Sequence, residues 1–216
     1  MSVIAIIPAR GGSKGIRDKN LQEVGGVSLI GRAIRSARLS KNIDEVYVST
    51  DSDRIADEAS RFGAKVVRRP DSISGDSASS ESAIEHTLRE IGEVNVVVFI
   101  QCTSPFILSN DIEKAVEMVK SKAYDSVLSA TEDHGFRWEA EEKTLQALGH
   151  NPERRLRRQD LPFRVLETGA FYVFRTDGFK ESGSRFHGRI GYVLTEKEFR
   201  PFRVFRHMLA IQSNAC

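Results

Sequence analysis

The sequence has few cysteines, little net charge and no long apolar run, and each absence excludes a class of protein. Its 216 residues contain only Cys102 and Cys216, which cannot make a disulfide framework and are typical of a reducing compartment. The net charge of +2 argues against a general nucleic-acid binder. The first apolar run, residues 3–7, is too short for a signal peptide or a membrane span. We therefore expect an intracellular, cytoplasmic protein that binds neither membrane nor nucleic acid.

Strand-like and helix-like patterns alternate over the first two-thirds of the chain. Apolar runs predict strands, and apolar residues at helical spacing predict helices, with Asp53 as an expected N-cap and Gly63 as an expected stop. The predicted strands are residues 3–7, 45–49, 65–68, 95–100 and 127–130, and the predicted helices are residues 29–37, 53–62, 80–91 and 110–120. This alternation predicts an α/β fold with a doubly wound, mostly parallel sheet, whose ligand lies beyond the carboxyl ends of the strands.

The pattern changes at about residue 132. A basic cluster at residues 154–158 follows, and then two strand-like runs at residues 170–174 and 189–194. We expect residues 132–190 to form a small antiparallel excursion from a single domain that spans residues 1–216. Such excursions often serve as dimerisation arms or substrate lids.

The loop after the first predicted strand, in "VIAIIPARGGSKGIRDKN", is rich in glycine and cations. It is not a Walker A loop, because Lys14 is followed by Gly15 and not by Ser or Thr. The glycine spacing also differs from the G-x-G-x-x-G of dinucleotide-binding proteins. The remaining functional interpretation is a nucleotidyltransferase loop that holds a triphosphate, and a solvated turn is the structural alternative.

Several segments together resemble one enzyme family. The stretches "IIPARGGSKGIRDKN", "VSTDSDRIADEA", "FIQCTSPF", "FRWE", "RRLRRQD" and "ETGAFYVF" occur in the order seen in acylneuraminate cytidylyltransferases, the CMP-sialic acid synthetases. The resemblance runs from Val3 to about Leu194. It implies a Rossmann-like fold of the nucleotide-sugar transferase type and transfer of a cytidylyl group from CTP to the anomeric hydroxyl of a sialic acid. It also implies a homodimer, joined through a dimerisation excursion, and a requirement for Mg²⁺.

The resemblance assigns the triphosphate to the glycine-rich loop, and the cations there suit an incoming charge near −4. The residues that it places on the triphosphate are Arg10, Ser13, Lys14, Lys19 and Asn20, of which Arg10, Lys14 and Lys19 are the expected catalytic ones. Arg69, Ser77 and Ser80 match positions around the nucleotide. For the serines, capping of a helix is the alternative interpretation.

The sugar acid is assigned to the end of the most apolar predicted strand and to residues nearer the C-terminus. Gln101, Thr103 and Ser104 follow the most apolar strand, where a doubly wound fold binds its ligand, and the resemblance places Gln101 close to the sugar acid. Tyr172 and Phe186 would line the sugar pocket, with ordinary core packing as the alternative for the two aromatics. Arg158 and Gln159 match a segment that binds the sugar carboxylate. The basic cluster that contains Arg158 is also compatible with a solvated patch or with nuclear import.

The last segment, residues 197–216, departs from the family's pattern. The family continues from its last strand into a D-I-D-x-D-type stretch whose aspartates bind magnesium, but this chain has no aspartate after Asp177, so the metal ligands are unknown. We favour a truncated or alternatively spliced form that retains nucleotide binding with weak or absent turnover, because the whole tail departs. Alternatively, Glu196, Glu198 or Asp51 holds the ion. A non-catalytic regulatory subunit that pairs through residues 132–190 is the hypothesis from a different class.

Overall fold

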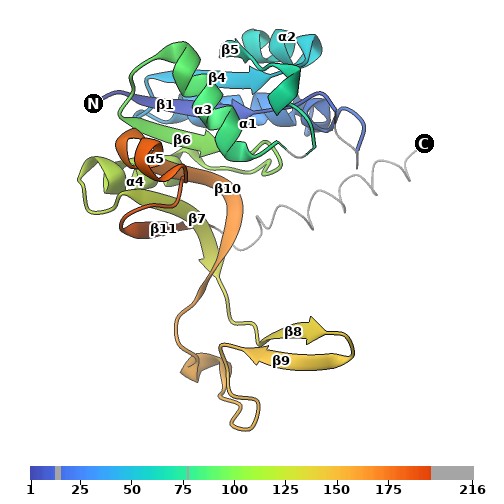
Figure 1. Ribbon diagram of the computed structural model, residues 1–216, viewed down its shortest axis with the longest axis vertical. Coiled ribbons are helices and arrows are strands. Elements are labelled where there is room, and N and C mark those ends of the chain that lie inside the picture. Colours follow the sequence, from blue (N-terminus) through green and yellow to red (C-terminus); the bar gives the residue numbers. More distant parts are fainter. Residues whose placement is uncertain (13–15, 77, 196–216) are drawn as a thin grey trace.

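A seven-stranded sheet forms the centre of the computed structural model, which describes residues 1–12, 16–76 and 78–195. The strand order is β11-β7-β10-β6-β1-β4-β5, and helices cover both faces (Figure 1). The strands are β1 (Val3–Pro8), β4 (Glu45–Thr50), β5 (Lys65–Arg68), β6 (Val96–Ile100), β7 (Ser126–Glu132), β10 (Val165–Arg175) and β11 (Ile190–Leu194). Only β10 runs against its neighbours in this sheet, so the predicted doubly wound, mostly parallel architecture is confirmed.

The helices divide between the two faces according to the residues that they bury. They are α1 (Leu29–Leu39), α2 (Asp53–Arg61), α3 (Ser80–Ile91), α4 (Ser109–Lys120) and α5 (Thr176–Ser182), with the 3-10 turns η1 (Lys19–Leu21), η2 (Asp71–Ile73) and η3 (Arg158–Asp160). Helices α1, α2 and α4 pack in one hydrophobic cluster, and α3 and α5 pack in the other. The result is a three-layer α/β arrangement.

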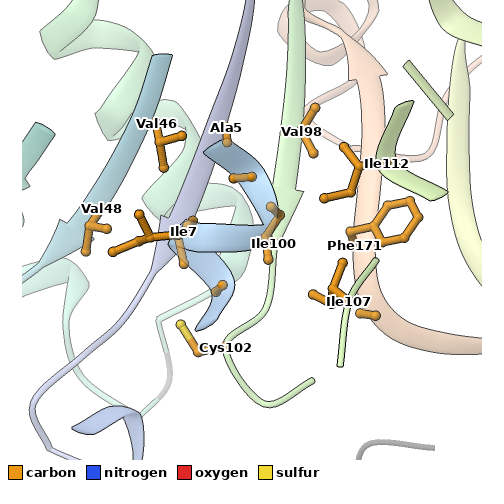
Figure 2. Packing of buried hydrophobic residues seen from close by; sticks show 14 of the residues in the cluster. Ala5, Ile7, Val46, Val48, Val98, Ile100, Cys102, Ile107, Ile112 and Phe171 are labelled. Atoms are coloured by element: carbon orange, nitrogen blue, oxygen red, sulfur yellow. The ribbon is translucent and has the colours of Figure 1, made fainter. Parts of the chain in front are cut away.

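Side chains of β1 point alternately to the two faces of the sheet, so this strand contributes to both hydrophobic clusters. Ala5 and Ile7 belong to the larger one, where Figure 2 shows Ala5 near Val46 and Val98 and Ile7 between Val48 and Ile100. Ile4 and Ile6 belong to the smaller one. Every residue of β6 is buried, as expected for a central strand covered on both faces.

Serine side chains cap the N-termini of α1 and α3. The Oγ of Ser28 accepts a hydrogen bond from the Gly31 N–H at 3.1 Å, and the Oγ of Ser79 accepts one from the Ser82 N–H at 3.0 Å. The prediction that Asp53 caps α2 was wrong by one residue, because Ser52 is the N-cap and Asp53 begins the helix. Gly63 follows α2 with φ of +80°, a left-handed conformation that favours glycine.

The projecting part of the chain is smaller than expected. The runs at residues 170–174 and 189–194 do form strands, but they lie in the central sheet as β10 and β11 and not in an excursion. The arm of Figure 1 consists of residues 133–164, with the antiparallel hairpin of β8 (Arg137–Glu141) and β9 (Thr144–Leu148) and the turn η3. A second short hairpin, β2 (Glu23–Val24) and β3 (Val27–Ser28), precedes α1. Whether the arm mediates dimerisation stays a prediction.

The connections create a topological switch between β1 and β6. From β1 the chain passes through β4 to β5 on one side, and then returns through α3 to β6 on the other side of β1. The loops that leave the carboxyl ends of β1 and β6 therefore diverge. In doubly wound sheets the ligand binds in the crevice at this point.

Candidate active site

Five neighbouring strands bring the candidate residues to one edge of the sheet. Arg10 follows β1, Asp51 follows β4, Arg69 follows β5 and Gln101 follows β6. Strand β10 runs antiparallel to β6, so its early residues, including Glu167, reach the same edge. The edge therefore presents two cations, Arg10 and Arg69, together with the carboxylate of Asp51 on the side of β1, β4 and β5. The side of β6 and β10 presents neutral or acidic polar groups.

Two side chains fix the backbone of the glycine-rich loop. The amide of Asn20, which is buried, donates from Nδ2 to the Arg10 carbonyl oxygen at 3.1 Å. The Gly11 N–H donates to the Asp51 Oδ1 at 2.9 Å. The guanidinium of Arg10 forms an ion pair with Asp76, with Nη2 2.8 Å from Oδ1. Asn20 thus acts on the loop itself, and a direct contact of Asn20 with substrate stays a prediction.

Cys102, which follows Gln101 after β6, is a buried thiol within electrostatic range of Lys19. Burial raises the pKa of the Cys102 thiol to about 12, and the charge of nearby Lys19 opposes that rise. The thiol is neutral at physiological pH and lies 4.0 Å from the Pro8 carbonyl oxygen. Cys102 is therefore a small, buried and neutral residue, and Lys19 lies within electrostatic range of it.

Arg69 is a buried cation, with only 8% of its surface exposed. Its Nη2 donates to the Ser49 carbonyl oxygen at 2.5 Å and its Nε to the Ser49 Oγ at 3.2 Å. Burial lowers the pKa of the Arg69 guanidinium, the charge of Asp51 raises it and the charge of Arg10 lowers it, so the three charges lie close together. The group stays protonated at neutral pH because the ordinary pKa of arginine is far above 7.

A bulge in β10 gathers the polar groups on the β6–β10 side of the edge. The pairing of β10 with β7 shifts register between Glu167 and Tyr172, and Gly169 lies between them with φ of +71°. A Cβ on Gly169 would lie 3.3 Å from the Gln101 Oε1 and 3.7 Å from the Tyr172 Oη. The Tyr172 hydroxyl donates to the Glu167 carboxylate, and burial together with this bond raises the pKa of Tyr172.

Arg185 is a site residue that the sequence analysis missed. Its guanidinium carbon lies 4.4 Å from the ring centre of Tyr172 and 5.3 Å from that of Phe186, and its Nη1 lies 3.0 Å from the Glu81 Oε1. Arg185 therefore fixes the two aromatics against the first turn of α3, where Ser80 is the first residue. Glu167, also missed as a separate candidate, was at least part of the "ETGAFYVF" stretch, whereas Arg185 follows no periodicity that would have indicated its contacts.

Some expected residues are not brought to this edge. Residues 158–160 form η3 on the arm, where Gln159 is exposed, and Figure 1 shows the arm extending away from the sheet. Thr103 and Ser104 do follow β6, and the Ser104 N–H donates to the Gln101 carbonyl oxygen at 3.2 Å. Ser13, Lys14, Ser77, Glu196 and Glu198 lie outside the described residues, as does the side chain of Arg158.

Residues 1–12, 16–76 and 78–195 contain neither a cluster of metal-ligating side chains nor a helix that could span a membrane. No three His, Cys, Asp or Glu side chains within them are grouped so that they could hold a metal ion. No helix in that part of the chain combines the length and the apolar character needed to cross a membrane.

Comparison with protein families and curated sequences gives one consistent result. A family model described as cytidylyltransferase matches residues 4–211. N-acylneuraminate cytidylyltransferase B of Danio rerio is 42% identical over 199 residues, which are 90% of this chain and 47% of that protein. N-acylneuraminate cytidylyltransferase of Oncorhynchus mykiss is 42% identical over 176 residues, 80% of this chain and 41% of the relative. The chain thus spans less than half the length of these curated relatives.

Solved structures of low sequence identity share the fold. A CMP:2-keto-3-deoxy-manno-octonic acid synthetase, solved in complex with CTP, has a TM-score of 0.70 at 17% identity, with 100% of both chains covered. A 4-diphosphocytidyl-2C-methyl-D-erythritol synthase from Anaerococcus prevotii has a TM-score of 0.65 at 15% identity, with 98% of this chain and 96% of the other covered.

Proposed function

This chain belongs to the cytidylyltransferase family, and from that premise we propose that it transfers the cytidylyl group of CTP to the anomeric hydroxyl of a sialic acid. The products are CMP-sialic acid and pyrophosphate. The observation that carries the proposal is the edge of the sheet where Arg10, Lys19 and Arg69 lie next to Gln101 and Tyr172. The choice of acceptor rests on the relatives at 42% identity that are named N-acylneuraminate cytidylyltransferases.

The cations of the edge suit the triphosphate. In the reaction, the anomeric hydroxyl releases its proton and its oxygen forms a bond to the α-phosphorus, while the bond from that phosphorus to the pyrophosphate oxygen breaks. Negative charge accumulates on the departing pyrophosphate, and guanidinium and ammonium groups held in place beforehand stabilise it. In the proposed complex Arg10 exchanges its ion pair with Asp76 for phosphate oxygens. Arg69, which is held by Ser49, would bind the nucleotide without rearrangement.

The β6–β10 side of the crevice suits the sugar acid. Gln101 offers both donor and acceptor atoms, and the Tyr172 hydroxyl with the Glu167 carboxylate offers a further polar pair that fits a sugar hydroxyl. The sheet order β10-β6-β1 places this side directly next to the phosphate loop. An acceptor bound there would therefore lie beside the α-phosphate.

Mg²⁺ is part of the proposal, since magnesium at nucleotide sites takes one or two carboxylates together with phosphate oxygens. Asp51 fits a ligand role, because its carboxylate lies beside the loop and accepts the Gly11 N–H. When bound, the ion would neutralise charge on the phosphates. Arg10, Lys19 and Arg69 would supply the remaining positive charge.

We further propose that the chain acts as a homodimer joined through the arm. Trp138 and Ala140 of β8 pair with Ala147 and Leu145 of β9, so all four share one face of the hairpin. Leu145 is 65% exposed and Trp138 is 46% exposed. A two-stranded hairpin is marginal by itself, so a second copy that covers this apolar face would stabilise it.

The compartment is proposed to be the cytoplasm, with the nucleus as the alternative. The basic cluster at residues 154–158 lies on the arm, where Arg154, Arg155 and Arg157 are exposed. Arg155 stacks on Phe136, with 4.3 Å between the guanidinium carbon and the ring centre, and Arg157 pairs with Asp160 at 2.7 Å.

A turnover assay with CTP, sialic acid and Mg²⁺, read as released pyrophosphate, tests the proposed function. Calorimetry gives CTP affinity separately. We expect Arg10→Gln to weaken CTP binding about tenfold to a hundredfold, because a charged hydrogen bond contributes roughly 1.5–3 kcal/mol. Arg89→Gln, which removes an exposed and paired arginine on α3, is the matched control and should bind CTP like the wild type.

The two readouts separate the hypotheses. Binding of CTP without release of pyrophosphate would favour the non-catalytic or regulatory form, and absence of both would reject the proposal. The same assay with Lys14→Ala tests the loop residue outside the described ranges, where unchanged affinity would indicate a solvated turn.

A further inference from the structure

A basic cavity lies between the ends of α1 and α2 and the β2–β3 hairpin. Its volume is about 730 Å³ and it is lined by Gly26, Val27, Arg35, Arg38, Leu39, Arg61 and Phe62. Helices α1 and α2 begin near the carboxyl edge of the sheet and run towards the opposite edge, so their last turns lie away from the phosphate loop. None of the lining residues is among the candidates for the CTP or sugar site.

Two glycines make this cavity possible. A Cβ on Gly31 would lie 2.6 Å from the ring of Phe62, so the ring rests directly on the α1 backbone. A Cβ on Gly63 would lie 1.8 Å from the Arg38 Nη1, which donates to the Gly63 carbonyl oxygen at 2.7 Å. Both distances are below any real Cβ contact, so larger residues at either position would displace Phe62 or Arg38.

The Phe62 ring organises two further arginines. The guanidinium carbon of Arg35 lies 5.0 Å from the ring centre and that of Arg61 lies 5.3 Å from it. Stacking on an aromatic ring holds a guanidinium by its face and leaves its N–H groups available. Two exposed cations therefore share one ring, with the exposed Arg38 beside them.

The positive charge of the cavity is only partly balanced by the described residues. Glu58 pairs with Arg61 at 2.9 Å, and the same carboxylate accepts a hydrogen bond from the Ser28 hydroxyl at 2.6 Å. No Asp or Glu lines the described cavity itself. The carboxyl ends of α1 and α2 favour a cation nearby, which accounts for Arg38 and Arg61. They do not account for Arg35, whose placement on Phe62 brings a third guanidinium into the cavity.

We propose that this cavity binds a phosphate-bearing small molecule, separately from the CTP site. Guanidinium forks bind phosphate oxygens in a bidentate manner, and several together match a doubly charged group. The volume lies in the range of small-molecule sites, so a mononucleotide or a sugar phosphate fits. The inference goes beyond the proposed transfer reaction and does not depend on it.

Calorimetric titration with pyrophosphate, in a phosphate-free buffer at low salt, tests the proposal. We expect two sites per wild-type chain, of which the double variant Arg35→Gln/Arg61→Gln loses one and Arg10→Gln loses the other. At the site that involves Arg35 and Arg61, the double variant should bind pyrophosphate at least about tenfold more weakly than the wild type does. This is the size expected when charged hydrogen bonds are removed. A wild type with a single site that only Arg10→Gln removes, or a double variant that retains both sites, would overturn the proposal.

A charge-matched control separates a specific site from general attraction. Arg89→Gln/Lys180→Gln also removes two positive charges, from exposed residues that pair with Glu85 and Glu93 on α3 and the loop after it. This control should keep both sites, and equal losses in both double variants would reject a built site. Arg35→Lys/Arg61→Lys should recover part of the binding, because charge returns without the planar fork. A circular dichroism melt of each variant confirms that it is folded.

Because Arg10 and the Arg35–Arg61 pair belong to different sites, the two proposals fail independently. Loss of turnover, or of the site that needs Arg10, bears on the transferase reaction alone. A wild type without a second pyrophosphate site would contradict the cavity proposal alone.

Discussion

Burial decides the chemistry of Cys102, which follows the central strand directly next to the candidate active site. The thiol is 3% exposed, and burial raises its pKa to about 12. A thiol with a raised pKa stays neutral until the pH approaches that value, so almost no thiolate exists at pH 8. Nearby Lys19 reduces the shift but does not reverse it.

We therefore expect Cys102 to resist alkylation. In a Cys216→Ser variant, which leaves Cys102 as the only thiol, iodoacetamide at pH 8 should react roughly 1,000-fold more slowly than with an exposed cysteine, because the thiolate fraction falls tenfold per pKa unit. The same variant unfolded in guanidinium is the control and should react at the ordinary rate. Rapid labelling of the native variant would show that Cys102 is accessible and ionised.

The side chains whose positions the sequence predicted best are those that directly follow a strand. Arg10, Arg69 and Gln101 each follow a predicted strand, so parallel topology alone requires that they lie at the same edge. Arg185 was missed because its role arises from packing against Tyr172, which lies in another element. No local pattern encodes a contact of that kind.

Among the elements, the bulge in β10 determines the geometry of the sugar side. It permits Gly169 to adopt φ of +71°, and the absence of a side chain there leaves room for the Gln101 amide and the Tyr172 hydroxyl. A Cβ would crowd the Gln101 Oε1 at 3.3 Å and would also be strained in the left-handed conformation.

Gly169→Ala should therefore weaken binding of sialic acid and destabilise the fold by about 1–2 kcal/mol, the usual cost of a left-handed non-glycine residue. Affinity for CTP should stay within about twofold, because the phosphate loop is not in contact with the change. Calorimetry and urea unfolding measure the two effects. Gly183→Ala is the control, since its φ of +68° gives the same strain with open space around the Cβ. If both variants lose sialic acid affinity equally, strain and not crowding of Gln101 is responsible.

The strands were predicted with different success for a physical reason. A strand that is buried on both faces, such as β6, is apolar throughout and is found from composition alone. The hairpin strand β8 was missed because "RWEAE" is fully exposed and carries three charges, which do not indicate a strand. The prediction that β10 lies in the excursion was wrong, because β10 belongs to the central sheet. A run of apolar residues shows that a strand is buried but not to which sheet it belongs.

For the molecule as a whole, the resemblance to cytidylyltransferases is confirmed by the family match, while the assembly remains to be tested. The arm is the part of the chain whose role depends on the assembly. It carries η3, with Arg158 and Gln159, away from the sheet, although the resemblance assigns these residues to the sugar carboxylate. Both statements agree if the arm of one copy reaches the crevice of another.

Leu145→Glu tests this arrangement, because it places a charge on the apolar face of the hairpin. Leu145 is 65% exposed in the single chain, so the substitution costs the monomer little, whereas burial of a carboxylate in an interface is strongly unfavourable. We expect light scattering to give twice the chain mass for the wild type and the chain mass for the variant. Gln146→Glu is the control, because Gln146 pairs with Glu139 on the opposite face of the hairpin and should leave the dimer intact.

The same pair of variants tests whether the arm completes the sugar site. If Arg158 and Gln159 act across the interface, Leu145→Glu should lose affinity for sialic acid while CTP still binds, since the triphosphate residues and Arg69 come from the sheet of a single copy. An arm that only holds the copies together would give a monomer that binds both ligands. A Leu145→Glu protein that remains dimeric would show that the contact between copies lies elsewhere.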